Sequence, residues 1–174
     1  EMNDDDFKEY GMDTGFDQVD LHDYPSQIAS EHLEAFKKLL GENNVSVKDY
    51  DRLSVAYGQT EYDLMRIRQH HFENLPDVVL YPEDSKQIQE IVYYCDKHKL
   101  PLYVYGGGSS VTRGVECVNN GVSLDMRKNF NKVISFNEID QTITVQSGMS
   151  GPCLEQALND APKRFNSKRA YTCG

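Results

Sequence analysis

In the first half of the chain, apolar residues recur at intervals of three and four, in three short segments that each begin near a helix-capping residue. Ser30 is placed to cap the first predicted helix, which stops at Gly41. The other two segments open on capping-box pairs, Ser46 with Asp49 and Thr60 with Asp63. Residues 25–75 are therefore predicted to form a small helical extension, closed by Pro76.

After Pro76, continuous apolar runs replace the helical spacing. Residues 77–81 and 102–105 predict buried strands, and residues 85–98, opened by Asp84 with Gln87, predict an amphipathic helix between them. This order is a βαβ unit, whose two strands are parallel. Further elements are predicted as a strand at 121–126, a hairpin from 132–136 and 141–146, and a helix from Gly151. The fold class is α/β with α+β character: a small parallel βαβ sheet, an antiparallel hairpin and a helical N-terminal extension.

Charge narrows the range of partners. The 174 residues carry a formal net charge of −10. Acidic side chains crowd residues 1–24, which show no periodicity and are predicted to form a flexible acidic leader. An acidic chain lacks the basic footprint that nucleic acid requires, so no nucleic-acid partner is expected. No apolar run approaches the roughly 20 residues of a membrane span, and no signal peptide is visible.

Cysteine and histidine spacing predicts no metal site. The cysteines at positions 95, 117, 153 and 173 form no CxxC pair. The adjacent His70 and His71 point to different faces of a helix and have no carboxylate at ligand spacing. In a chain of this length the cysteine pattern is typical of reduced thiols and predicts a cytoplasmic location.

The stretch VYGGGSSVTRG, residues 104–114, is the candidate binding loop. Three consecutive glycines are costly to order. They follow the carboxyl end of a buried strand, where ligands bind in open α/β sheets. Successive bare amides form a concave nest for an anion, and Ser109 and Ser110 add hydroxyl donors. A tight turn is the alternative, and the position after a βαβ unit favours a phosphate. Arg113 and the basic run at 163–169 are expected to face solvent.

Several motifs in order resemble the first part of the FAD-binding domain of the vanillyl-alcohol oxidase / p-cresol methylhydroxylase (PCMH-type) superfamily. They are PDVVLYPEDSKQIQEIVYYCDKHKLPLYVYGGGSSVTRG, then VSLDM, then ITVQSGMSGPCLEQAL. Within the superfamily, DRLSVAYGQTEYDLMRIRQHHFENLPDVVLYP and AYTCG are similar to alkyldihydroxyacetonephosphate synthases. The resemblance implies that residues 76–174 are the N-terminal part of a PCMH-type FAD-binding domain.

The resemblance also implies which residues bind the cofactor. The glycine loop would embrace the FAD pyrophosphate through Val104, Tyr105, Gly106, Gly107, Gly108, Ser109 and Ser110. Tyr81 and Pro82 would lie toward the adenine, and Gly148 matches a glycine close to the cofactor. Many members attach FAD through a histidine just after the glycines. This chain has serines there, so non-covalent FAD is expected.

The activity implied by the resemblance is exchange of an acyl for an alkyl group on acyl-dihydroxyacetone phosphate, in ether-lipid synthesis. The first alternative is an FAD-dependent oxidase or dehydrogenase of D-lactate or glycolate, and the second is a noncatalytic nucleotide-binding or assembly module. The family's catalytic residues would lie beyond Gly174, so this stretch alone is expected to be inactive and to bind FAD weakly or not at all. A homodimer is expected, with peripheral membrane contact of the full protein and a peroxisome-like organelle as location in a eukaryote.

Overall fold

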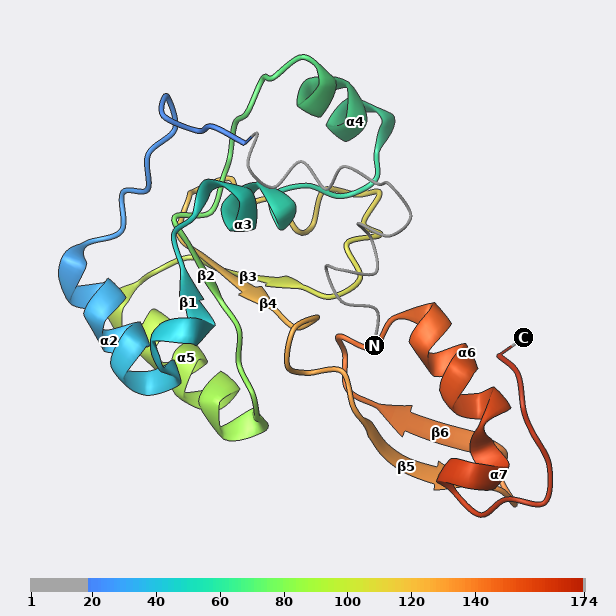
Figure 1. Cartoon of the computed structure of the whole chain (residues 1–174). Coiled ribbons are helices and arrows are strands. Elements are labelled where there is room, and N and C mark those ends of the chain that lie inside the picture. Colours follow the sequence, from blue (N-terminus) through green and yellow to red (C-terminus); the bar gives the residue numbers. More distant parts are fainter. Residues whose placement is uncertain (1–18, 174) are drawn as a thin grey trace.

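The computed structural model describes residues 19–173, and the predicted leader up to residue 18 lies outside them. Figure 1 shows short helices around a small sheet, with a hairpin and two more helices to one side. The elements are α2 (Ser30–Leu40), the 3-10 turn η2 (Glu42–Asn44), β1 (Val45–Ser46), α3 (Asp49–Ser54), α4 (Glu61–Arg68), β2 (Val78–Leu80), α5 (Ser85–His98), β3 (Leu102–Tyr105), β4 (Val122–Asp125), β5 (Val133–Asn137), β6 (Thr142–Val145), α6 (Gly151–Asn159) and α7 (Ala161–Arg164). No helix among the described residues is long and apolar enough to cross a bilayer.

The main sheet has four strands in the order β1-β2-β4-β3. Strands β2 and β3 are parallel, as a βαβ unit requires, but they are not neighbours, because β4 lies between them and pairs in parallel with both. The short strand β1 adds an antiparallel edge through Val45 opposite Leu80. The sequence had assigned Ser46 to a helix cap. That assignment is wrong, because Ser46 belongs to β1 and its hydroxyl donates to Asp51.

Alternate residues of β2 point to opposite faces of the sheet and pack into two separate hydrophobic clusters. Val78 and Leu80 of β2 face one way and pack with buried residues of α2 and α5. Val79 faces the other way and packs with Val55, at the end of α3, and Tyr105. Helix α5 begins and ends as predicted and contributes its apolar stripe to the first cluster. Strands β2 and β4 are buried along their whole length, which is typical of strands inside a parallel sheet.

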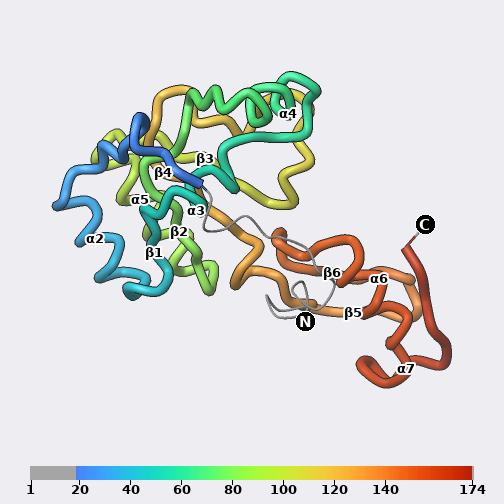
Figure 2. Tube along the Cα trace, turned by 45° about the horizontal axis from the view of Figure 1, so that its top comes forward, coloured from blue at the N-terminus to red at the C-terminus, as the bar shows by residue number. Residues whose placement is uncertain are grey.

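The C-terminal part of the described chain forms a second layer. Strands β5 and β6 pair as the predicted antiparallel hairpin, in a sheet of their own. Phe136 of β5 stacks on Phe165 after α7, with ring centroids 4.9 Å apart. In Figure 2 this hairpin, α6 and α7 again lie to one side of the main sheet.

The helical extension forms with some changes in its caps. Thr60 and Asp63 make the predicted capping box of α4, with both backbone hydrogen bonds present. Helix α2 begins at Ser30 itself, with Ala29 in the cap position, and α3 stops at Ser54, four residues before Gly58. Leu21, which lies within the stretch predicted as leader, is buried with Ala56, Tyr57, Phe72 and Leu75.

Helix α4 is inverted relative to the usual amphipathic pattern. Asp63 and Arg66 are buried, whereas Leu64 and Ile67 are 43% and 38% exposed. The Arg66 guanidinium donates to Asp63 at 2.6 Å and to Glu116 at 2.7 Å, and it lies 3.6 Å from the Tyr57 ring centroid. Buried charges are tolerated only when paired and hydrogen-bonded. The Arg66–Glu116 pair therefore joins α4 to a loop 50 residues further along the chain.

Glu116 is the acid-sensitive member of this cluster. Burial alone would raise its pKa, but hydrogen bonds from Arg113, Arg66 and Asn74 outweigh burial and lower the pKa to about 2. A folded-state pKa below the unfolded value stabilises the protein above the unfolded pKa, and this contribution is lost as the pH falls toward the folded value.

We predict that the free energy of unfolding falls between about pH 4.5 and pH 2, as Glu116 is protonated on unfolding. Glu116→Gln should lower stability at pH 7 by about 3 kcal/mol, because buried Arg66 loses one of its charged partners and keeps Asp63, and should flatten the pH dependence in that window. Urea unfolding at a series of pH values measures both effects. The exposed Glu90→Gln is the control, and an equal pH dependence in the two variants would refute the assignment.

Candidate functional site

The parallel strands end at one edge, where the candidate residues gather. Leu80, Leu124 and Val104 are in register across β2, β4 and β3. The residues that follow them, Tyr81, Asp125 and Tyr105, therefore lie along the carboxyl edge of the sheet. Pro82 comes next after β2 and is buried. The sheet thus brings the two predicted binding segments, the turn after β2 and the glycine loop after β3, to the same edge.

The glycine loop, residues 106–110, leaves its backbone donors unused. None of its five amides donates to an acceptor within residues 19–173. Gly108 has a φ of +68°, and a left-handed residue within a run of amides turns the donors toward a common point. Backbone N–H groups require a partner, from water or from a ligand. The loop is therefore suited to bind an anion.

The glycines of the site differ in whether their surroundings leave room for a side chain. A Cβ at Gly108 would overlap the Tyr105 hydroxyl, and one at Gly148 would overlap the carbonyl oxygen of Met126. A Cβ at Gly106 would lie 3.3 Å from the carbonyl oxygen of Ser147, tighter than most real contacts. A Cβ at Gly107 would meet no atom within 4 Å. Packing therefore explains glycine at 106, 108 and 148, and it does not explain glycine at 107.

The open space beside Gly107 is part of a cavity of about 430 Å³ between the main sheet and α6. Its lining includes Gly107, Arg127, Gly148, Ser150, Cys153 and Arg164. Ser150 caps α6 by accepting from the Cys153 amide, so the N-terminal end of that helix opens on the cavity. Helix N-termini and arginines both favour negative charge. Pro82, Val104 and Tyr105 do not line this cavity.

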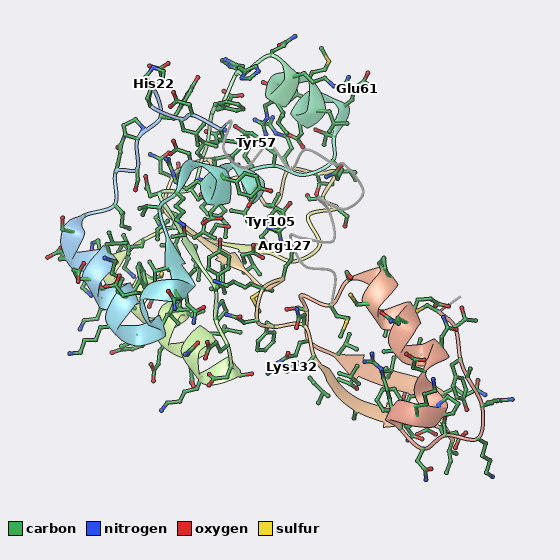
Figure 3. The ribbon with its side chains drawn as sticks, viewed as in Figure 1. His22, Tyr57, Glu61, Tyr105, Arg127 and Lys132 are labelled. Atoms are coloured by element: carbon green, nitrogen blue, oxygen red, sulfur yellow. The ribbon has the colours of Figure 1, made fainter. Side chains whose placement is uncertain are left out.

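Arg127 is a cavity residue that the sequence analysis missed. Its guanidinium makes a bidentate pair with Asp125, with Nε to Oδ1 at 3.0 Å and Nη2 to Oδ2 at 2.7 Å. It also lies 4.6 Å from the centroid of the Tyr105 ring, and Figure 3 shows the two side chains next to each other. This packing fixes the arginine at the cavity wall. The signal available in the sequence was a cation just after a buried strand, in the order SLDMR.

The remaining predicted residues have distinct settings. Val104 is 55% exposed on the edge strand β3, whereas Tyr105 is buried beneath the loop. Burial raises the pKa of Tyr105, and the nearby Arg127 partly opposes this rise. The Ser110 hydroxyl accepts from the Gly114 amide at 3.2 Å, while Ser109 is exposed.

Arg113 is exposed, as expected, and is also committed to Glu116 through two hydrogen bonds of 2.6 and 2.8 Å. Arg164, placed by the sequence in a solvated basic run, instead lines the cavity. Of the five loop residues with free amides, Gly107 is the one that lines this cavity, together with Arg127, Arg164 and the N-terminal end of α6. This set suits a phosphate group.

Comparison with known proteins agrees with this chemistry. Residues 76–168, more than half of the chain, match the FAD binding domain family. An alkyldihydroxyacetonephosphate synthase of Dictyostelium discoideum is 28% identical over 80% of this chain and 23% of the relative. A mitochondrial D-lactate dehydrogenase (cytochrome) of Kluyveromyces lactis is 31% identical over 73% of this chain and 23% of the relative. The chain thus spans about a quarter of the length of the curated relatives it matches.

Solved structures show the same fold. A structure of alkyldihydroxyacetonephosphate synthase superposes with a TM-score of 0.73 and 26% identity, over 81% of this chain and 26% of that one. p-Cresol methylhydroxylase superposes with a TM-score of 0.55 and 20% identity, over 82% of this chain and 26% of that one. The predicted PCMH-type fold is confirmed. The chain belongs to the FAD binding domain family, and FAD is the cofactor that this family binds.

Proposed function

We propose that the glycine loop holds the pyrophosphate of FAD in an enzyme similar to alkyldihydroxyacetonephosphate synthase. Gly107 carries the proposal, because its Cβ position is open although its neighbours are packed. A ligand that approaches the backbone closely accounts for a glycine that packing does not require. The free amides of residues 106–110 supply the hydrogen bonds that a pyrophosphate accepts.

Each element of the cavity has a distinct part in this proposal. The loop amides donate to phosphate oxygens and Arg164 offsets their charge, while Arg127, which is paired with Asp125, forms part of the cavity wall. Gly148 lets the turn before α6 pack against Met126, which brings the helix N-terminus to the cavity. Bound FAD supplies the isoalloxazine ring for the chemistry, and the protein supplies position and electrostatics. Ser109 and Ser110 offer no imidazole for a covalent bond to the flavin, so the proposed FAD is non-covalent.

The extent of the match favours the synthase. A synthase of Caenorhabditis elegans is 27% identical over 97% of this chain, a span that takes in the helical extension. The D-lactate dehydrogenases of Kluyveromyces lactis and Saccharomyces cerevisiae match over 73% and 80% of this chain. The proposed reaction is therefore exchange of an acyl for an alkyl group on a dihydroxyacetone phosphate lipid. A D-2-hydroxyacid dehydrogenase is the second candidate, favoured by the 31% identity of the Kluyveromyces lactis relative.

We predict weak, saturable binding of FAD by the 174-residue chain, because the pyrophosphate would be held while other parts of the cofactor meet few residues. Quenching of flavin fluorescence measures the affinity, and absorbance near 450 nm measures what co-purifies. No turnover of acyl-dihydroxyacetone phosphate is expected from this stretch alone. Flavin co-purifying at one equivalent would contradict the prediction.

We predict that Gly107→Val abolishes FAD binding while the Tm stays within about 1 °C of wild type, because a Cβ at Gly107 meets no protein atom within 4 Å and the added side chain takes the phosphate position. Fluorescence titration and thermal unfolding measure the two effects. Gly114→Val is the matched control, since a Cβ at Gly114 also meets nothing within 4 Å and Gly114 does not line the cavity. Equal FAD affinity in the two variants would exclude Gly107 from the site.

The two reactions are separated by the redox state of the flavin. A full-length protein that carries this chain should keep its flavin oxidised when incubated anaerobically with D-lactate or glycolate, because acyl-for-alkyl exchange has no net redox change. Absorbance at 450 nm follows the flavin. Bleaching by either hydroxy acid would favour the dehydrogenase over the synthase.

A further inference from the structure

The helical extension touches the glycine loop at its last residue. The Gln59 amide donates to the carbonyl oxygen of Ser110 at 2.8 Å. Gly58 lies so close to the same carbonyl that a Cβ there would overlap the Ser110 oxygen. The contact is therefore between two backbones, and it has no side chain that could rotate away to relieve a change.

A second contact holds the segment that follows. Glu116 is 3% exposed and accepts from Arg66 at 2.7 Å and from Asn74 at 2.7 Å. Both donors belong to the part of the chain before Pro76, which comes earlier in sequence than the whole FAD-family match. The segment 110–116 is thus fixed to the extension at both of its ends.

The loop depends on these contacts, because none of the amides of residues 106–110 donates a hydrogen bond within the described chain. At one end the Tyr105 carbonyl accepts from the Met126 amide, which ties the loop to β4. At the other end Ser110 is tied to Gly58 and Gln59. The positions of Tyr105 and Ser110 therefore set the direction in which the free amides between them point.

We propose that Gly58, Gln59 and Arg66 of the helical extension are positioning residues for the cofactor loop. They set the geometry of the amides at 106–110 without touching the cofactor, and this role rests on the proposed pyrophosphate site. A displaced amide donates poorly to a phosphate oxygen even when the loop remains folded. The extension would thus determine FAD affinity, in addition to packing on both faces of the sheet.

The test compares two variants that lower stability in different places. Gly58→Ala pushes on the Ser110 carbonyl, whereas Ile91→Val removes a methyl group from the cluster under α5, on the other face of the sheet. Flavin quenching gives the Kd for FAD, thermal unfolding gives the Tm, and 1H–15N spectra of the free chain give the amide shifts of Gly106–Gly108. If these residues only stabilise the fold, two variants with equal losses of Tm should show equal changes in the Kd for FAD.

We expect Gly58→Ala to raise the Kd by about tenfold, the equivalent of one hydrogen bond to a charged group, and to shift the Gly106–Gly108 amides. Ile91→Val should leave the Kd within about twofold and the three shifts unchanged. Glu116→Gln, which weakens the second contact, should also raise the Kd and decides the outcome if Gly58→Ala does not fold. Unchanged Kd and unchanged loop shifts in the Gly58 and Glu116 variants would overturn the inference. If wild type binds no FAD, the proposed pyrophosphate site fails, and the amide shifts still decide whether the extension positions the loop.

Discussion

A loop that makes no hydrogen bonds through its own amides must be held from outside, and this constraint shapes the molecule around residues 106–110. The sheet supplies one anchor, where β3 pairs with β4 and the Tyr105 carbonyl accepts from Met126. The helical extension supplies the other, where Gln59 donates to Ser110. Gly108 completes the loop by turning at a positive φ over the Tyr105 hydroxyl. With the loop held at these two ends, the amides between them remain free to bind a ligand.

Buried charge gives the second anchor its rigidity. Arg66 enters the interior together with Asp63 and Glu116, and the aromatic ring of Tyr57 covers its guanidinium. Such a cluster adds little net stability compared with apolar packing, but it is costly to break and fixes one geometry. The outward-facing apolar residues of α4, Leu64 and Ile67 among them, are the consequence. The buried face of α4 thus carries the charged side chains Asp63 and Arg66, and Arg66 holds the loop segment at Glu116.

Local rules were enough to predict most of the fold. Helical and strand spacing located α5, β3 and the hairpin within a residue or two, and the Thr60–Asp63 box began α4 as expected. The order and pairing of the strands could not be predicted from the sequence. The insertion of β4 between β2 and β3, and the pairing of Ser46 with β2, depend on sheet contacts that sequence spacing does not encode. Helical spacing also predicted a buried apolar face on α4. That face is charged instead, because Arg66 pairs with Glu116, 50 residues away, and sequence spacing contains no information on such a partner.

The candidate site was predictable in part for the same reason. The glycine loop was found from its composition, but only the structure separates Gly107 from Gly106, Gly108 and Gly148, since packing around each Cβ decides. Arg127 reaches the cavity through its pairing with Asp125 at the end of β4, and Arg164 through the fold of the hairpin layer.

The central claim is that the amides of residues 106–110 receive phosphate, and a 1H–15N titration of the chain tests it most directly. FAD should shift the amides of residues 106–110, whereas riboflavin, which has the same ring and no phosphate, should leave them in place. Equal shifts with both ligands, or FAD shifts confined to other residues, would contradict the claim.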